Sequence, residues 1–283
     1  MSENNQDIKK ATVSNYSSRN STHYDDPMNK NFVYGEMTVN FVKQIEFEDK
    51  DEVILDIGCG TGFAYDILYE KIKNEKRKFI GIDPAKGMLD LAIDKFKSNS
   101  NFTFYEGTFA KIPLEDNSVD KIISTLAMHW VPSLDDSIKE MKRVLKPNGS
   151  IEIMMTAKDD GEGFKKPIIK AMQKHLNFKQ IMKASALSQR VSPTHIEKYF
   201  GKEFDLEKDY ILNVDNVKKV LYGTFDQHMK WWKARSEQII SEVENKDQFM
   251  NDLNETLNTI KDDQGIPFDL SILHIKLKEK KQL

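Results

Sequence analysis

The fold of this chain is decided by one stretch, Val53-Ile54-Leu55-Asp56-Ile57-Gly58-Cys59-Gly60-Thr61-Gly62-Phe63. An apolar run rich in β-branched residues gives way to a glycine at every second position, and apolar residues then recur at helical spacing. That order predicts a buried strand over 53–57, a tight turn and a helix. Glycine allows positive φ and leaves no Cβ between the backbone and a ligand above the turn. The free N–H groups at the helix start can hold a polar or anionic group.

The spacing of the glycines distinguishes between the known glycine-rich turns. The phosphate loop of nucleotide hydrolases ends in Gly-Lys-Ser/Thr, whereas Gly62 is followed by Phe63. The dinucleotide fingerprint is G-x-G-x-x-G, and here the third glycine comes one position early. The pattern Asp-x-Gly-x-Gly-x-Gly over 56–62 resembles motif I of class I S-adenosylmethionine-dependent methyltransferases. A chance glycine cluster in a surface turn is the alternative, but it does not account for strand, turn and helix signals in this order.

The resemblance implies S-adenosyl-L-methionine as the cofactor and an α/β fold related to the dinucleotide-binding one. It also assigns the residues of the motif to the cofactor site: Asp56, Gly58, Cys59, Gly60, Thr61 and Gly62.

A carboxylate follows the second predicted strand at the distance that a nucleoside site needs. Asp83 closes the run Phe79-Ile80-Gly81-Ile82 of a strand expected over 78–82. It comes about 20 residues after the glycine turn, where a carboxylate can accept hydrogen bonds from both ribose hydroxyls. The alternative is a solvated Asp that opens the next helix, expected over 84–97. Pro84 is assigned to the adenine, and Met88 on this helix is assigned to the same cofactor site.

The loops after the next two strands complete the predicted cofactor site. After the strand 102–105 the family usually has an Asp that contacts the adenine amino group, and Thr108 stands in its place. A hydroxyl can still accept from an amino group, so Thr108 and its neighbour Phe109 are assigned to the cofactor. After the strand 119–124, Thr125 lies in a segment that faces the cofactor in the family. The N-terminal segment folds over the cofactor in such enzymes, so Tyr24 is a further candidate, with plain packing as the alternative.

The order of elements predicts a doubly wound α/β fold with a seven-stranded, mostly parallel sheet and a helical lid over the substrate. We expect a flexible segment at 1–25, the cofactor-binding core at 26–156, and the lid with the last two strands at 157–283. In that last part we expect helices at 163–183, 193–200, 216–232 and 236–261, and strands at 210–214 and 273–277, the second antiparallel. Trp231 and Trp232 are candidates for the substrate pocket, with a role in the core as the simpler alternative.

Composition limits the partners of the protein. Of its 283 residues 39% are apolar, which is enough for a substantial core. The net charge of −3 gives no overall basic field, so nucleic acid is not an expected partner. The chain has no long apolar run and no apolar signal segment at 1–10, and its one cysteine excludes an intramolecular disulfide. We expect a cytoplasmic monomer or homodimer that acts on a small molecule, without a membrane and without a metal.

The segment Ala127-Met128-His129-Trp130-Val131-Pro132 carries the strongest hint of a methyl acceptor. Neither Asn/Asp-Pro-Pro-Tyr nor Pro-Cys follows the fourth strand, which argues against acceptors on DNA bases or glutamine, and Ser124 and Thr125 stand where catechol-type magnesium enzymes have Asp. The His-Trp pair resembles that of the trans-aconitate, malonyl-carrier-protein, juvenile hormone acid and salicylic acid carboxyl methyltransferases. This resemblance makes His129 and Trp130 the candidate catalytic residues. The alternative is a tryptophan packed under the lid and an ordinary buried histidine.

Three functions fit the sequence. The first is O-methylation of a small-molecule carboxylate, which is ionised at neutral pH and needs a hydrogen-bond donor rather than a base. The second is N-, C- or phenol O-methylation, in which His129 would act as general base. The third is a non-catalytic cofactor-binding protein, against which the complete glycine set and Asp83 argue.

Overall fold

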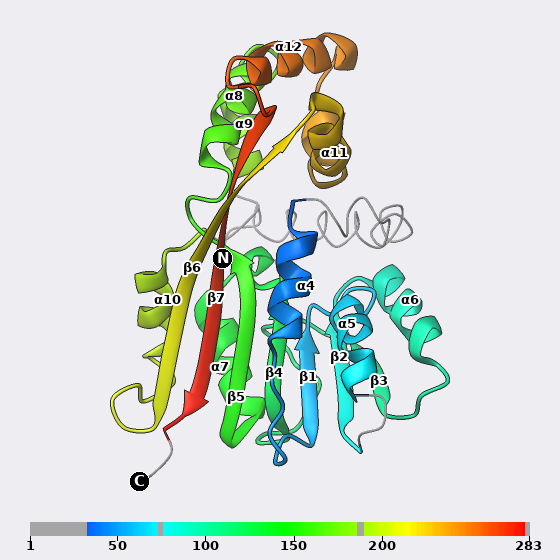
Figure 1. The fold of residues 1–283 in the computed structure, drawn as a ribbon, viewed down its shortest axis with the longest axis vertical. Coiled ribbons are helices and arrows are strands. Elements are labelled where there is room, and N and C mark those ends of the chain that lie inside the picture. The colour runs from blue at the N-terminus through cyan, green and yellow to red at the C-terminus, as the bar shows by residue number, and fades with distance from the viewer. Residues whose placement is uncertain (1–32, 73–75, 186–189, 281–283) are drawn as a thin grey trace. The chain divides into compact units, whose positions relative to one another are not determined.

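A sheet of seven strands forms the frame of the protein, which a computed structural model describes over residues 33–72, 76–185 and 190–280. The strands are β1 (Val53–Ile57), β2 (Lys78–Asp83), β3 (Phe102–Glu106), β4 (Val119–Thr125), β5 (Leu145–Thr156), β6 (Tyr210–Gly223) and β7 (Ile266–Glu279). Their order is β3-β2-β1-β4-β5-β7-β6, parallel from β3 to β5 (Figure 1). β7 pairs with β5 in the antiparallel direction. The predicted doubly wound, mostly parallel sheet is therefore confirmed.

The chain divides into two compact units. The first comprises residues 1–157, 189–216 and 272–283, and the second comprises 158–188 and 217–271. Both β6 and β7 run from one unit into the other, because the boundaries at 216/217 and 271/272 fall inside these strands. The expected division into a core and a substrate lid stays a prediction, and the segment expected to be flexible, 1–25, lies outside the described residues.

Helices cover both faces of the sheet in the first unit. One face carries α4 (Gly35–Lys43), α5 (Phe63–Ile72) and α6 (Lys86–Phe96) (Figure 1). There Tyr65 of α5 meets the ring of Phe79 at 5.5 Å between centroids, and Phe96 of α6 stacks on Phe102 at 4.5 Å. The opposite face carries α7 (Leu134–Val144) and α10 (Pro193–Phe200), whose apolar side chains join those of β4, β5 and β7 in one buried core. These two layers hold the strand ends of β1, β2 and β4 in fixed positions.

The second unit is built from helices around a cluster of aromatic rings. Its helices are α8 (Glu162–Met172), α9 (Phe178–Ser185), α11 (Phe225–Ser241) and α12 (Lys246–Asn258). The rings of Phe164 and Trp231 pack on Phe268 at 5.1 Å and 5.0 Å. Trp232 contacts Phe249 at 6.4 Å, and both tryptophans are buried. The two tryptophans therefore pack in the interior of this unit. Across the described part of the chain, every helix is too short or too polar to cross a membrane.

Three of the helices expected after residue 156 have the wrong bounds. Residues 216–223 belong to β6 instead of a helix, and there the backbone of Gly223 packs closely against Gly265 near the start of β7. The helix expected over 163–183 is interrupted before α9, where the amide of Gln180 donates to Asn177 Oδ1. The helix expected over 236–261 is likewise interrupted before α12, at the N-cap Asn245. Pairing with β7 overrides the helical spacing in the first case, and side-chain capping starts a new helix in the others.

Candidate functional site

The glycine turn after β1 is fixed by contacts that leave no room for a side chain at two of its three glycines, Gly58 and Gly62. Gly58, Gly60 and Gly62 have φ of 73°, 54° and 77°. A Cβ on Gly58 would lie 2.2 Å from the Cβ of Ala127, and one on Gly62 would lie 2.7 Å from the ring of Phe96. The amides of Gly58 and Cys59 both donate to the carbonyl of Ile82, at 2.8 and 3.1 Å. The turn is thereby pinned to the end of β2, next to Asp83.

Asp83 accepts hydrogen bonds from a backbone amide of the glycine turn and from the amide of the residue that precedes α6. Its Oδ2 accepts from the amide of Gly60 at 3.0 Å, and its Oδ1 accepts from the amide of Ala85 at 2.8 Å. Burial raises the pKa of this carboxyl, and the two amide hydrogen bonds counteract that rise. Each carboxylate oxygen can accept more than one hydrogen bond, so both oxygens keep acceptor capacity for a ligand.

Asp56 of β1 is unusual because its carboxyl group is buried and neither carboxyl oxygen has a hydrogen-bond partner among the described residues. Burial, followed by the charge of Asp83, raises the pKa of this carboxyl to about 8. An unpartnered buried carboxyl is costly when it is charged, so this position favours either a proton or a nearby cation.

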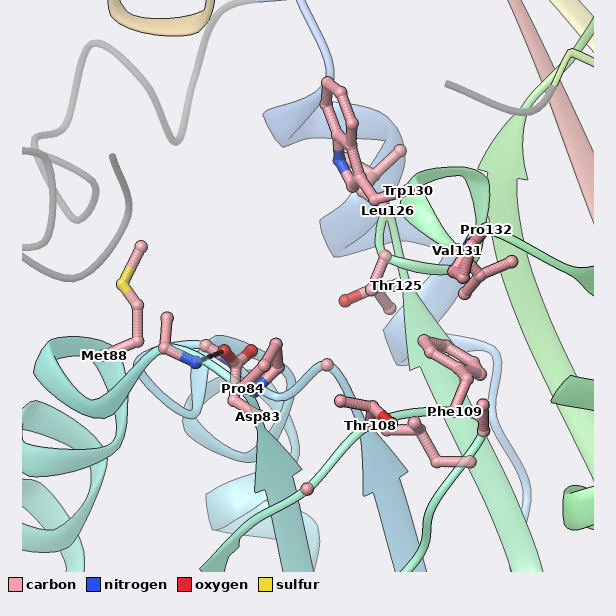
Figure 2. A pocket seen from close by; sticks show the side chains of 17 residues that line it. Asp83, Pro84, Met88, Thr108, Phe109, Thr125, Leu126, Trp130, Val131 and Pro132 are labelled. Carbon is pink, nitrogen blue, oxygen red and sulfur yellow. Dashed lines mark hydrogen bonds between the residues drawn. The ribbon is translucent and has the colours of Figure 1, made fainter. Parts of the chain in front are cut away.

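A cavity of about 220 Å³ opens at this edge of the sheet. Figure 2 shows Asp83 and Pro84 at the lower left, Thr108 and Phe109 at the lower right, and Thr125 and Trp130 above them. Nine of the residues assigned to the site from the sequence line it: Gly58, Gly60, Asp83, Pro84, Met88, Thr108, Phe109, Thr125 and Trp130. The hydroxyls of the two threonines and the indole N–H are polar groups in a mostly apolar wall.

The other assigned residues do not line the cavity. Cys59 and Thr61 are buried within the turn, where burial raises the pKa of the Cys59 thiol. Asp56 and Gly62 also lie outside the lining, and Tyr24 lies outside the described residues. His129 is 5% exposed and packs against the ring of Trp130 at 4.9 Å between centroids. Of the two candidate catalytic residues, the structure thus brings only Trp130 to the cavity.

Eight further residues complete the wall of the cavity. Four of them belong to the segment 125–132 that was expected to face the cofactor, and four were not assigned from the sequence: Leu126, Ala127, Val131 and Pro132 in the first group, and Ile57, Ala85, Gly107 and Ala110 in the second. Leu126 has φ of 53°, a left-handed conformation that is unfavourable for leucine. Its amide donates to the carbonyl of Met154 at 2.8 Å, which holds the backbone there. This turn directs Ala127 onto Gly58 and starts the short 3₁₀ helix η1 (Met128–Trp130). No propensity signal marks Leu126, because the conformation is imposed by its neighbours.

Comparisons with known proteins agree with this arrangement. A family model described as a methyltransferase domain matches residues 55–153. A malonyl-[acyl-carrier protein] O-methyltransferase of Marinomonas is 39% identical over 100 residues, 35% of this chain and 36% of that protein. The chain thus spans little more than a third of that relative. A ubiquinone/menaquinone biosynthesis C-methyltransferase UbiE of Campylobacter jejuni is 30% identical over 173 residues, which are 59% of this chain and 70% of that protein.

Solved structures share the fold at low sequence identity. A possible histamine N-methyltransferase of Thermotoga maritima superposes with a TM-score of 0.53 at 17% identity, over 97% of this chain and 99% of that one. A phosphoethanolamine N-methyltransferase 2 of Haemonchus contortus, solved with S-adenosylhomocysteine, gives 0.58 at 17% identity, over 96% of this chain and 61% of that one. The folds agree and the C. jejuni relative is matched over most of its length, so the chain belongs to the S-adenosylmethionine-dependent methyltransferases.

Proposed function

We propose that the protein transfers the methyl group of S-adenosyl-L-methionine to a carboxylate of a small molecule. The bound cofactor supplies a methyl group on a sulfonium, and its transfer is an in-line displacement. The protein therefore has to align the acceptor with the methyl group and to exclude water. The acceptor class rests on one observation: the indole of Trp130, a hydrogen-bond donor that cannot accept, lines the cavity.

The residues present fit the cofactor. The free acceptor capacity of Asp83 suits two ribose hydroxyls, and the bare backbone at Gly58 and Gly60 allows close approach. The buried, unpartnered carboxyl of Asp56 suits a ligand that brings positive charge nearby, which would favour the ionised carboxylate. We assign these residues to holding and orienting the cofactor.

Trp130 suits an anionic acceptor. A carboxylate has a pKa near 4 and is already ionised at neutral pH, so it needs no base to become a nucleophile. A donor that holds one carboxylate oxygen leaves the other free to attack the methyl group. In Figure 2 the indole nitrogen of Trp130 lies on the side of the ring that faces the open space above Thr125. His129, whose ring packs against the indole at a tilt of 45°, is then a residue that holds the indole in place.

Methylation of carbon is the second candidate. It is favoured by the relative matched over most of its length, whose name describes a C-methyltransferase of quinone biosynthesis. A carbon acceptor, like a phenol or an amine, would need a group that removes a proton.

The chemistry of the product distinguishes the candidates. The protein is incubated with cofactor labelled in the methyl group and with panels of carboxylic acids, phenols and amines. We expect an acid to be labelled and the label to be released as volatile methanol by mild alkali, because esters hydrolyse under conditions that ethers, methylamines and C-methyl groups survive. A label that resists alkali would overturn the carboxylate assignment.

Replacing Trp130 tests the proposed donor. Trp130→Phe should lower kcat about ten-fold or more while the affinity for S-adenosylhomocysteine stays within two-fold, because one hydrogen bond to a charged group is lost. Trp232→Phe, a change in the interior of the second unit, serves as the control. His129→Asn should have a milder effect than Trp130→Phe. A His129 variant that is inactive at pH 7 and recovers at high pH would instead identify a histidine base.

A further inference from the structure

The loop between β3 and β4 supplies one wall of the cavity. Gly107, Thr108, Phe109 and Ala110 all line it. Thr108 and Lys111 close a tight turn by exchanging backbone hydrogen bonds of 3.1 and 3.0 Å. The loop is therefore compact next to the cavity, but it needs a second anchor to fix the turn relative to the sheet.

Arg143 of α7 provides an anchor directly after this turn. Its Nη2 donates to the carbonyl of Ile112 at 3.0 Å, and its Nη1 donates to the carbonyl of Leu114 at 2.9 Å. Nη1 also donates to Asp116 at 2.6 Å, while Nη2 and Nε donate to the two carboxylate oxygens of Glu140 at 2.8 and 2.9 Å. A guanidinium has five N–H donors, and these contacts use all of them.

Glu140 completes the anchor from the same helix. Its Oε1 accepts from the amide of Ile112 at 3.0 Å, so Arg143 and Glu140 together hold both polar backbone groups of that residue. The hydrogen bonds from Arg143 are the main cause of a lowered pKa of the Glu140 carboxyl. Ile112 itself is buried in the core, one residue beyond the turn that carries Thr108 and Phe109.

We propose that Arg143, with Glu140, is a positioning residue that holds the loop 107–116 in the conformation that binds the cofactor. This inference rests on the proposed function, which places the cofactor in the cavity. Arg143 is absent from the residues that line the cavity, so its effect on binding would be transmitted through the loop. Without the anchor the loop would have to be ordered by the ligand, and that ordering would weaken binding.

Arg77 offers a matched control. It precedes β2, at the end of that strand opposite Asp83, and its guanidinium also holds backbone carbonyls: Nε donates to Asp51 at 2.6 Å and Nη2 to Glu48 at 2.9 Å. Arg77 is likewise outside the cavity lining. Arg77 and Arg143 both hold loops, but the loop held by Arg77 lies at the edge of the sheet opposite Asp83. Comparing variants of the two therefore distinguishes a loss of local positioning from a loss of stability.

The test compares Arg143→Gln, Arg143→Lys and Arg77→Gln with the wild type. Calorimetric titration with S-adenosylhomocysteine, well below the unfolding temperature of each variant, should show about ten-fold weaker binding for both Arg143 variants. Lysine keeps the charge but cannot reproduce five fixed donors, so it should not rescue binding. Arg77→Gln should bind within two-fold of the wild type even where it unfolds at a lower temperature.

Hydrogen exchange of the ligand-free proteins provides a second measurement that is independent of the cofactor. Amides of 107–116 should lose protection in the Arg143 variants and keep it in Arg77→Gln. A wild type that fails to bind S-adenosylhomocysteine would refute the proposed cofactor site, and loop protection would still decide whether Arg143 orders the loop. Unchanged protection in the Arg143 variants, unchanged binding in them, or equally weakened binding in Arg77→Gln would each overturn the inference.

Discussion

The glycine turn after β1 and the helical second unit are stabilised by different means. In the turn, the backbone of Gly58 lies so close to the methyl group of Ala127 that a Cβ at position 58 would overlap it. In the second unit, aromatic side chains fill the interior, with Phe164, Trp231 and Phe268 in mutual contact. Close backbone contact tolerates few residue types, whereas an apolar interior accepts many combinations of similar volume. A short segment such as the turn is therefore more specific in a sequence than the helices are, whose bounds were predicted less accurately.

The sharpest test of this difference is a pair of alanine substitutions in the turn. Gly58→Ala should destabilise the protein by about 3–5 kcal/mol, because it combines a left-handed φ with a contact of 2.2 Å. Gly60→Ala should cost only about 1 kcal/mol, since a Cβ there has no atom within 4 Å. Chemical denaturation measures both. Equal losses of stability in the two variants would show that the close approach does not limit residue 58.

The buried carboxyl group of Asp56 gives the next largest expected effect, a change of stability with pH. The pKa of Asp56 is raised to about 8 in the folded protein, so stability should fall as pH rises from about 4 to about 8. Asp56→Asn should remove this dependence and stabilise the ligand-free protein at pH 8 by at least about 2 kcal/mol. Urea denaturation at pH 5 and pH 8 compares the variant with the wild type. A variant less stable than the wild type at pH 8 would contradict the assignment of an unpartnered carboxyl.

The ribose contact proposed for Asp83 predicts a smaller change, in binding. Asp83→Ala should weaken the binding of S-adenosylmethionine about ten-fold or more, because two charge-assisted hydrogen bonds are lost. Asp90→Ala is the control, since Asp90 forms an exposed ion pair with Lys86 on α6. Calorimetry on both variants checks the expectation. Unchanged affinity in Asp83→Ala would mean that the ribose lies elsewhere.

The second unit should respond to pH in the opposite direction, and more weakly. His228 is buried, its Nε2–H donates to the carbonyl of Ile266 at 2.9 Å, and its Nδ1 accepts from the indole of Trp231 at 3.4 Å. Burial lowers the pKa of this imidazole, so stability should be lost as pH falls below about 6.5. Thermal denaturation between pH 5 and pH 8 should show a smaller dependence in His228→Gln than in the exposed control His195→Gln. A variant with the same slope as the control would exclude His228 as the source.

Local signals in the sequence correctly predicted several parts of the first unit, which includes the glycine turn. The strand expected over 53–57 matches β1 at both ends, and the helix expected at 193–200 matches α10, which has Pro193 in its first turn. Asp83, Thr108 and Trp130 meet at one cavity because parallel strands bring their carboxyl ends to the same edge of the sheet. His129 could not be placed from the sequence, because the side to which it turns depends on the backbone at Leu126.

In the second unit, the extent of β6 is set by pairing with a strand that is distant in sequence. The starts of the helices are set by short capping signals, which the helical spacing over long segments did not reveal. Val217, Val220 and Leu221 are spaced as in a helix, but pairing with a strand far along the chain places them in β6. The helix breaks did have a local signal. Three positions carry Asn or Thr followed three residues later by Gln, and in the structure each caps a helix: Asn177 with Gln180, Thr224 with Gln227, and Asn245 with Gln248.

The path of the chain through the two units has a consequence for dissecting the protein. Each of the two segments of the second unit, 158–188 and 217–271, leaves the first unit and returns to it. A truncation at either terminus therefore cannot remove the second unit and spare the first, and a single protease cut cannot release either as an intact fragment. Grafting the second unit onto another methyltransferase would require two simultaneous insertions, with the strands β6 and β7 transferred in register.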